Sequence, residues 1–205
     1  MSTQADRSYL RWFFLLALLG LVADQASKYG IFAWLYSANT EHTFVVIPEV
    51  FNLVASYKHV PWDTEQPFAF LRTASSPMVP HVNHGALFGI GGDSGFGNLL
   101  FTVVSAVASL VIVGVALRAS VRQDRLLSLS LGMILSGTVG NLYDRLVFGG
   151  VRDFFHWYKF VNWPVFNVAD VCLVCGAGLL VLHAFLFAED AAPATEAGAN
   201  PTSAR

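Results

Sequence analysis

The chain has 205 residues, of which 55% are hydrophobic and 13% are charged, and its formal net charge is −2. An average soluble domain carries about 25% charged residues, so this composition excludes a disordered chain and argues against a soluble globule. The basic residues form no stripe interleaved with aromatic residues, which excludes nucleic acid as a partner. The apolar residues instead occur in long runs, and these predict a polytopic membrane protein.

Four apolar stretches are each about as long as the 17–25 residues that a helix needs to cross roughly 30 Å of hydrocarbon. They are continuously apolar and do not alternate with polar residues, which indicates helices and not the strands of a barrel. The expected fold is therefore an all-α integral membrane protein, with one four-helix domain over residues 1–188. The predicted spans are residues 12–36, 99–117, 126–147 and 171–188.

The arginines predict the orientation of these spans. The positive-inside rule places short loops rich in Lys and Arg in the cytoplasm. Here the N-terminus and the link between the second and third spans are the basic regions. We therefore expect both termini inside and the loops 37–98 and 148–169 outside. The basic residues are Arg7, Arg11, Arg118, Arg122 and Arg125.

The two ends of the chain carry separate expectations. A cleavable signal peptide is the alternative for the N-terminus, because its basic start and an apolar core ending at Ala23 imitate one. Position −3 would then be Leu21 and not a small residue, and the apolar run resumes at Ile31, so a retained first span is favoured. Residues 189–205 are rich in Ala, Pro, Thr and Ser and predict a disordered cytoplasmic tail.

Ionisable side chains within a span cost roughly 2.5–3.5 kcal/mol each, so every one needs a partner or a function. Asp24 and Lys28 lie four residues apart on one helical face, and either a structural ion pair or a functional pair would explain them. Asn141 and Arg145 also share a face, near the outer end of the third span. The guanidinium of Arg145 would either face the bundle or reach lipid headgroups.

Two further carboxylates flank an aromatic segment. Seven aromatic residues from Phe154 to Phe166 predict a segment lying along the membrane interface. Asp153 lies just beyond the third span and Asp170 at the start of the fourth, so antiparallel helices bring both to the same depth. Two carboxylates about 3 Å apart share a proton, and one then acts as a base while the other donates to a carbonyl. The alternative is that Asp170 or Asn167 only caps the fourth helix.

Five motifs follow one another along the spans. They are Asp24-Gln25-Ala26-Ser27-Lys28, Asn83-His84-Gly85-Ala86-Leu87-Phe88-Gly89, Gly140-Asn141-Leu142-Tyr143-Asp144-Arg145, Val151-Arg152-Asp153-Phe154 and Phe166-Asn167-Val168-Ala169-Asp170. In this order they resemble the motifs of the bacterial lipoprotein signal peptidases (signal peptidase II), from about Leu10 to Phe187. The resemblance implies a membrane aspartic endopeptidase that removes the signal peptide of a prolipoprotein just before its diacylglyceryl-modified cysteine. It also implies a site near the outer face of the bacterial cytoplasmic (inner) membrane.

The resemblance assigns the site residue by residue. The two catalytic aspartates fall on Asp153 and Asp170, whereas Asp144 matches the polar helix motif and not the dyad. Six other polar residues receive supporting roles. Asn141 and Arg145 help to hold the lipid-bearing substrate, Asn83 lies beside the active site, Asn167 supports the dyad, and Asp24 with Lys28 stabilises the fold near it.

The first outer loop departs from the family pattern. Its β-branched and aromatic residues predict short strands, and the family's small extracytoplasmic sheet would include part of residues 44–57 and the block that starts at Asn83. The family runs almost directly from a Phe-x-Leu strand into that block. Here a Pro-rich stretch intervenes, and about 25 residues, roughly 58–82, are interpreted as an insertion. We expect it to affect the choice of substrate and not the chemistry.

No metal or cofactor is expected. Cys172 and Cys175 form a C-x-x-C inside the fourth span, but they lack the partner cysteines or clustered histidines of a zinc site and suit apolar packing. The partners that the resemblance implies are diacylglyceryl-modified prolipoproteins, membrane lipid and globomycin-type peptide inhibitors. A small transporter with an intramembrane charge relay, or a non-enzymatic scaffold, remains the alternative, although no inverted repeat is present.

Overall fold

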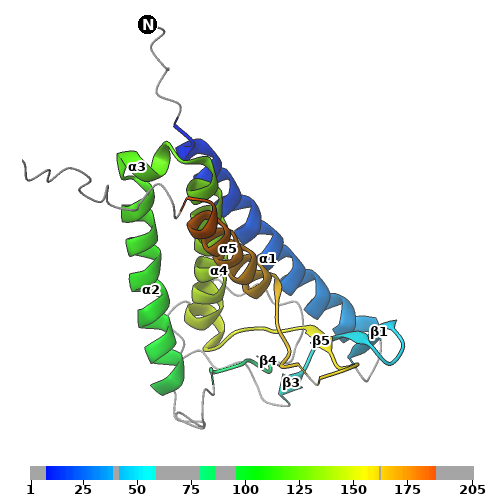
Figure 1. Ribbon diagram of the computed structural model, residues 1–205. Coiled ribbons are helices and arrows are strands. Elements are labelled where there is room, and N and C mark those ends of the chain that lie inside the picture. The colour runs from blue at the N-terminus through cyan, green and yellow to red at the C-terminus, as the bar shows by residue number, and fades with distance from the viewer. Residues whose placement is uncertain (1–7, 39–41, 59–78, 86–95, 162, 188–205) are drawn as a thin grey trace, which may run out of the picture.

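The computed structural model describes residues 8–38, 42–58, 79–85, 96–161 and 163–187. Within these ranges four helices are long and apolar enough to cross a membrane, which confirms the expected fold class. They are α1 (Leu10–Ala38), α2 (Phe96–Ala116), α4 (Arg125–Phe148) and α5 (Val168–Leu186), and the short α3 (Ala119–Arg122) links α2 to α4. Figure 1 shows α4 packed among the other three long helices.

The bundle has two distinct ends, called here the α3 end and the sheet end (Figure 1). At the α3 end the backbone N–H of Tyr9, just before α1, donates to the carbonyl of Arg122 in α3 at 2.6 Å. Successive long helices run in opposite directions, so α1 and α4 both start at the α3 end and finish at the sheet end. The connection between α4 and α5 therefore lies at the sheet end.

Helix α4 approaches its neighbours closely because it lacks side chains at the crossing points. A Cβ atom at Gly140 would lie 2.5 Å from Asp24 Oδ2 of α1, and one at Gly137 would collide with the carbonyl of Ala169 in α5. Small residues let the backbones of membrane helices approach in this way. Gly149 then ends α4 with a left-handed φ of 77°, a conformation that glycine adopts without a Cβ clash.

A three-stranded antiparallel sheet covers the sheet end, in the order β1 (Thr43–Ile47), β2 (Phe51–Val54), β5 (Phe155–Trp157). The predicted small sheet is thus present over part of residues 44–57. Its third strand is β5 from the aromatic segment, for which no strand was predicted, whereas Asn83, the first residue of the block expected in the sheet, forms only an isolated bridge with Val151. Phe32 and Leu35 of α1 are buried together with Phe154 beside β5, and this cluster fixes the sheet to the bundle.

A separate two-stranded ladder stands where the interpreted insertion begins and ends. β3 (Tyr57–Lys58) pairs with β4 (Val79–Pro80), and Lys58 lies opposite Val79. The insertion between these strands, residues 59–78, lies outside the described residues, as does the predicted tail 189–205. The two ends of the inserted stretch are therefore hydrogen-bonded neighbours.

Candidate functional site

The carboxylates of Asp153 and Asp170 are joined through one residue, Asn167. The Asn167 Nδ2 donates to Asp153 Oδ1 at 2.7 Å, and the backbone N–H of Asn167 donates to Asp170 Oδ2 at 3.1 Å. Asp153 belongs to the loop after α4, and Asp170 to the first turn of α5. The structure thus brings together the two carboxylates that the sequence paired.

The first turn of α5 makes these contacts as part of its own cap. Asn167 is the N-cap residue, its Oδ1 accepts from the N–H of Asp170 at 3.1 Å, and Asp170 closes a capping box by accepting from Asn167 N–H. Asn167 and Asp170 therefore do cap α5, as the alternative explanation predicted. This cap does not exclude a dyad, because the same amide also reaches Asp153.

Two more asparagines hold the outer oxygens of the pair. Asn141 of α4 donates from Nδ2 to Asp170 Oδ1 at 2.9 Å. Asn83 donates from Nδ2 to Asp153 Oδ2 at 3.1 Å. Its backbone N–H donates to the carbonyl of Val151, and its own carbonyl accepts from the N–H of Val151. Each oxygen of both carboxylates thus receives a hydrogen bond, and the two side chains are held in fixed positions.

Burial raises the pKa of the Asp153 carboxyl to about 6. The hydrogen bonds from Asn83 and Asn167 oppose this rise in the pKa, and the negative charge of Asp170 adds to it. A carboxyl with a pKa near 6 holds a proton under mildly acid conditions and releases it readily near neutrality. Asp153 is therefore suited to exchange a proton with a reacting group.

Asp24 and Lys28 lie beneath the carboxylate pair and are fully buried. The Lys28 ammonium is 2.9 Å from Asp24 Oδ2 and also donates to Asn141 Oδ1 at 3.2 Å. Asp24 Oδ1 accepts from the backbone N–H of Ala169 at 2.9 Å. The two side chains form a buried ion pair, which connects α1 both to the asparagine that holds Asp170 and to the first turn of α5.

Sequence analysis missed two residues that complete this buried layer, Arg152 and Gln25. The side chain and backbone N–H of Arg152 donate to both oxygens of Asp144, and Arg152 Nη2 donates to Gln25 Oε1 at 2.9 Å. Asp144 is also 3.5 Å from the Lys28 ammonium. Because Arg152 directly precedes Asp153, this clamp fixes the loop that carries the first carboxylate.

Arg145 lies apart from the hydrogen bonds of the pair. Its guanidinium carbon is 4.9 Å from the ring centre of Phe101 in α2. Its Nε and Nη1 atoms are buried and have no hydrogen-bond partner among the described residues. This position favours a side chain that faces the bundle over one that reaches lipid headgroups. Buried donors of this kind are available to an oxygen atom of a ligand.

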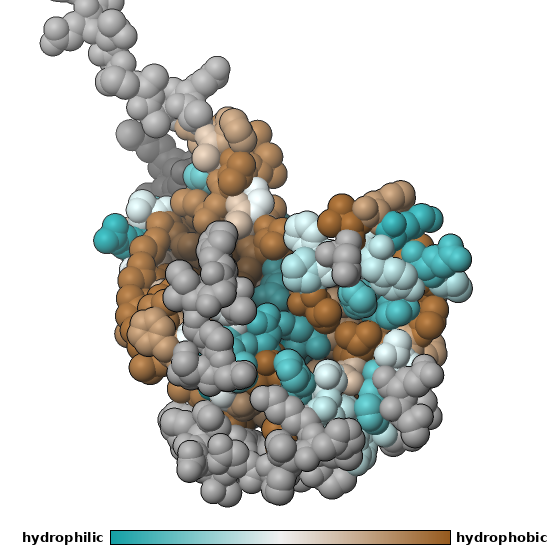
Figure 2. Space-filling view, turned by 90° about the horizontal axis from the view of Figure 1, so that it is seen from below, coloured by the Kyte–Doolittle hydropathy of each residue, from teal (hydrophilic) through white to brown (hydrophobic). Residues whose placement is uncertain are grey.

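The face of the molecule at the sheet end is mixed in character. Viewed from that end, hydrophilic side chains gather in the middle of the molecule and apolar side chains flank them (Figure 2). Two carboxyl groups that share a proton can provide a general acid and a general base for attack by water on a carbonyl.

Comparisons with known proteins agree with this geometry. A family model described as signal peptidase (SPase) II matches residues 16–186. The lipoprotein signal peptidase of Pseudomonas putida is 35% identical over 181 residues, covering 86% of this chain and 87% of that protein. The one from Psychromonas ingrahamii is 31% identical over 195 residues and covers 94% of each chain.

A solved structure described as a bacterial membrane enzyme shares the fold, with a TM-score of 0.65 at 20% identity over 92% of this chain and 96% of that one. A second bacterial membrane enzyme gives a TM-score of 0.63 at 22% identity, over 86% and 94% of the two chains. The family resemblance inferred from the five motifs is thereby confirmed. The chain belongs to the signal peptidase II family and is a multi-pass membrane peptidase.

Proposed function

We propose that this chain removes the signal peptides of prolipoproteins, cutting on the N-terminal side of the diacylglyceryl-modified cysteine with Asp153 and Asp170 as an aspartic dyad. The observation that carries the proposal is the shared asparagine, whose amide and backbone N–H reach both carboxylates. The family supports prolipoprotein processing, and the relatives cited above are lipoprotein signal peptidases.

The geometry supports a division of labour between the two carboxyls. Asp170 lies in the first turn of α5, where the helix dipole stabilises a negative charge, and it serves as the base. Asp153, with its raised pKa, carries the shared proton. Asp170 takes a proton from water as the water oxygen bonds to the scissile carbonyl carbon, and Asp153 protonates the carbonyl oxygen.

The resulting gem-diol then collapses. Asp170 passes its proton to the amide nitrogen, the C–N bond breaks, and Asp153 recovers a proton from one hydroxyl of the gem-diol. Both carboxyls end in their starting protonation states, so the cycle needs no cofactor. Asn167 and Asn141 keep the base in place, and Asn83 orients the acid.

Substrate would reach the dyad sideways from the bilayer, with its acyl chains left in the lipid. The Nε and Nη1 atoms of Arg145, which have no hydrogen-bond partner among the described residues, would donate to an oxygen near the lipidated cysteine, with Asn141 beside them on α4. A globomycin-type peptide would occupy the same place and block the carboxyls. The inserted residues 58–82 would influence which prolipoproteins are cleaved.

We also propose that the chain lies in the bacterial inner membrane with its termini in the cytoplasm and the dyad at the outer face. Support comes from the arginines. Arg11, Arg118, Arg122 and Arg125 lie at the α3 end, which the positive-inside rule assigns to the cytoplasm. The carboxylate pair lies at the opposite end, and residues 1–188 would form one peptidase domain.

The test is cleavage of a diacylglyceryl-modified prolipoprotein by purified wild type, Asp153→Asn and Asp170→Asn. Asp144→Asn is unsuitable as a control because Asp144 is fully buried in the charged layer. Glu49→Gln, at an exposed turn of the sheet, is a matched acid-to-amide change. We expect wild type and Glu49→Gln to cleave and both dyad variants to lose at least about 1,000-fold in rate. Cleavage by a folded dyad variant at the wild-type rate would refute the proposal.

The role of the insertion has its own test. Because Lys58 pairs with Val79, a two-residue Asn-Gly turn can replace residues 59–78 without separating the paired strands. We expect this deletion to insert normally and to cleave, with altered relative rates among a panel of prolipoproteins. Loss of cleavage towards every substrate by a normally inserted protein would contradict a role in substrate choice.

A further inference from the structure

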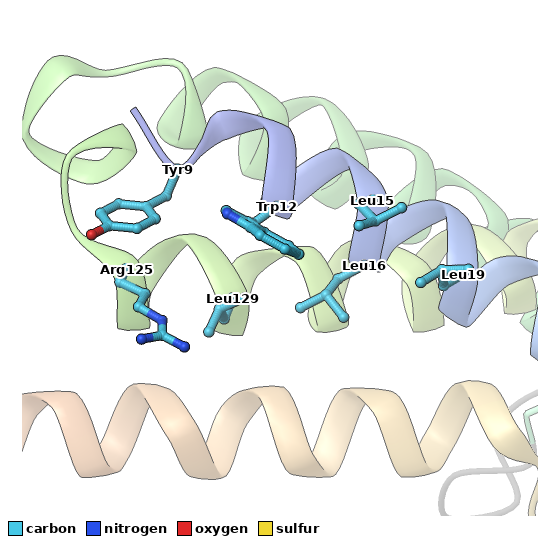
Figure 3. A pocket seen from close by; sticks show the side chains of 7 residues that line it. All are labelled: Tyr9, Trp12, Leu15, Leu16, Leu19, Arg125 and Leu129. Atoms are coloured by element: carbon cyan, nitrogen blue, oxygen red, sulfur yellow. The ribbon is translucent and has the colours of Figure 1, made fainter. Parts of the chain in front are cut away.

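A groove unrelated to the dyad opens at the α3 end, between the start of α1 and the start of α4. Its cavity is about 530 Å³ and is lined by four leucines together with Tyr9, Trp12 and Arg125. Figure 3 shows Trp12 and Leu16 of α1 and Arg125 and Leu129 of α4 turned towards the same space. The carboxylate pair lies at the opposite end of the bundle, so the proposed peptidase chemistry makes no use of this groove.

The depth of the groove corresponds to one leaflet of a bilayer. The wall formed by Tyr9 and the start of α1 extends to Leu19, ten steps along the chain that span about 15 Å at roughly 1.5 Å per residue. A hydrocarbon core of about 30 Å gives each leaflet about this depth. The leucines make the wall apolar along the helices. The hydroxyl of Tyr9 and the indole N–H of Trp12 are polar groups at the end of the wall nearest α3. Amphipathic rings of this kind lie at headgroup level.

The mouth of the groove carries an available positive charge. Arg125 is exposed and is the first residue of α4. The neighbouring carboxylate, Asp124, is already engaged: one oxygen accepts from Leu127 N–H at 2.9 Å, and the other is 2.7 Å from His183 Nε2. No ion pair joins Arg125 to a carboxylate in the part of the chain that the structure describes.

We propose that this groove binds an anionic phospholipid of the leaflet at the α3 end. One acyl chain lies along the four leucines, and the phosphate accepts hydrogen bonds from the guanidinium of Arg125. Guanidinium groups match phosphate oxygens in a bidentate geometry. A zwitterionic lipid would fill the same apolar space, but its cationic headgroup would be repelled by Arg125, so the site discriminates by headgroup charge.

The test compares phosphatidylglycerol with phosphatidylcholine of identical acyl chains, titrated onto the purified full chain in detergent micelles and counted by native mass spectrometry. We expect one tightly held phosphatidylglycerol, bound about fivefold or more tightly than phosphatidylcholine. Arg125→Gln should bring the two affinities together, and Arg125→Lys should keep part of the preference. Arg118→Gln removes an exposed cation at the N-cap of α3 that does not line the groove, and it should leave the affinities for both lipids unchanged.

A second pair of variants fills the groove without changing charge. Leu19 is 54% exposed, so Leu19→Trp should fold and weaken binding of both lipids, whereas Leu110→Trp on the lipid-facing side of α2 should not. Equal binding of the two lipids by wild type would overturn the proposal. Equal loss from Arg118→Gln and Arg125→Gln would also overturn it by assigning the preference to the basic surface in general. Displacement of the lipid by inorganic phosphate at matched concentration would refute a lipid site.

Discussion

Helices α2 and α4 are both long enough to cross a membrane, yet they differ in how much of their surface is buried in the protein and in how many polar side chains they carry. In the most apolar stretch of each helix, 50% of the residues of α4 are buried in the protein, against 6% for α2. α4 carries Asp144, Asn141 and a series of glycines and serines, whereas α2 has no charged side chain. In a bilayer the hydrophobic effect does not separate helices into core and surface, so polar contacts and close packing do. The most apolar helix consequently faces lipid, and the polar one lies at the centre.

The largest expected effect comes from breaking the buried charge layer that α4 shares with α1. Asp144→Asn leaves the fully buried Arg152 guanidinium and Lys28 ammonium without their common carboxylate. Removing one partner of a buried ion pair costs about 3–5 kcal/mol. We expect a loss of this size in the free energy of unfolding in detergent micelles. Leu110→Ala on the exposed side of α2 should change the same quantity by less than 1 kcal/mol, about the effect of most surface substitutions. Equal losses would contradict the contrast between the helices.

An intermediate effect is expected when the same small substitution is made in both helices. A Cβ at Gly140 would lie 2.5 Å from a carboxylate oxygen of Asp24, whereas a Cβ at Gly114 of α2 meets nothing within 4 Å. Gly140→Ala should therefore destabilise by about 1–3 kcal/mol through overpacking. Gly114→Ala should leave stability unchanged or raise it by up to about 1 kcal/mol, because alanine favours the helix. Thermal unfolding midpoints of the two variants measure the difference.

A third expected effect depends on pH and concerns the loop that follows α4. Burial raises the pKa of Asp153 to about 6, above the value of about 3.9 for an unfolded chain. The folded state therefore binds more protons between these values, and Asp153 destabilises the fold increasingly as the pH rises through this window. The difference in unfolding midpoint between Asp153→Asn and wild type should thus shift in favour of the variant, towards a higher relative midpoint, when the pH is raised from 4 to 8. A difference that does not change with pH would show that the carboxyl is not destabilised by burial.

Sequence alone predicted the features that depend on local composition. Continuous apolar runs were enough to predict the four spans. The positions of Asp153 and Asp170 at adjoining helix ends were enough to predict that they lie close together. The expected start of α5 was too late, at residue 171, because hydropathy rises only after Asp170. The helix begins at Val168, immediately after the capping residue Asn167. A cap is a polar signal, and hydropathy does not report it.

The missed features depend on contacts between distant parts of the chain. Arg152 reaches Gln25 across 127 positions, and no local pattern marks either residue as a member of the charged layer. Strand β5 has three residues, and its partner Phe51 lies more than 100 positions away from Trp157. A three-residue aromatic segment has no strand periodicity of its own, so it forms a strand only because β2 supplies its hydrogen bonds.

The capping box of α5 has a consequence for when the enzyme becomes active. Asn167 both starts α5 and reaches the two carboxylates, and Asp24 of α1 fixes the N–H of Ala169 in the same turn. Helix α5 therefore completes an arrangement whose other groups lie on α1, on α4 and in two loops at the sheet end. If Asp153 and Asp170 are the dyad proposed above, a chain in which α5 is not yet inserted lacks the positioned carboxylates and would not cut its neighbours in the membrane. Hydrolysis would then begin only after assembly, and proteolytic activity would report that the bundle has closed.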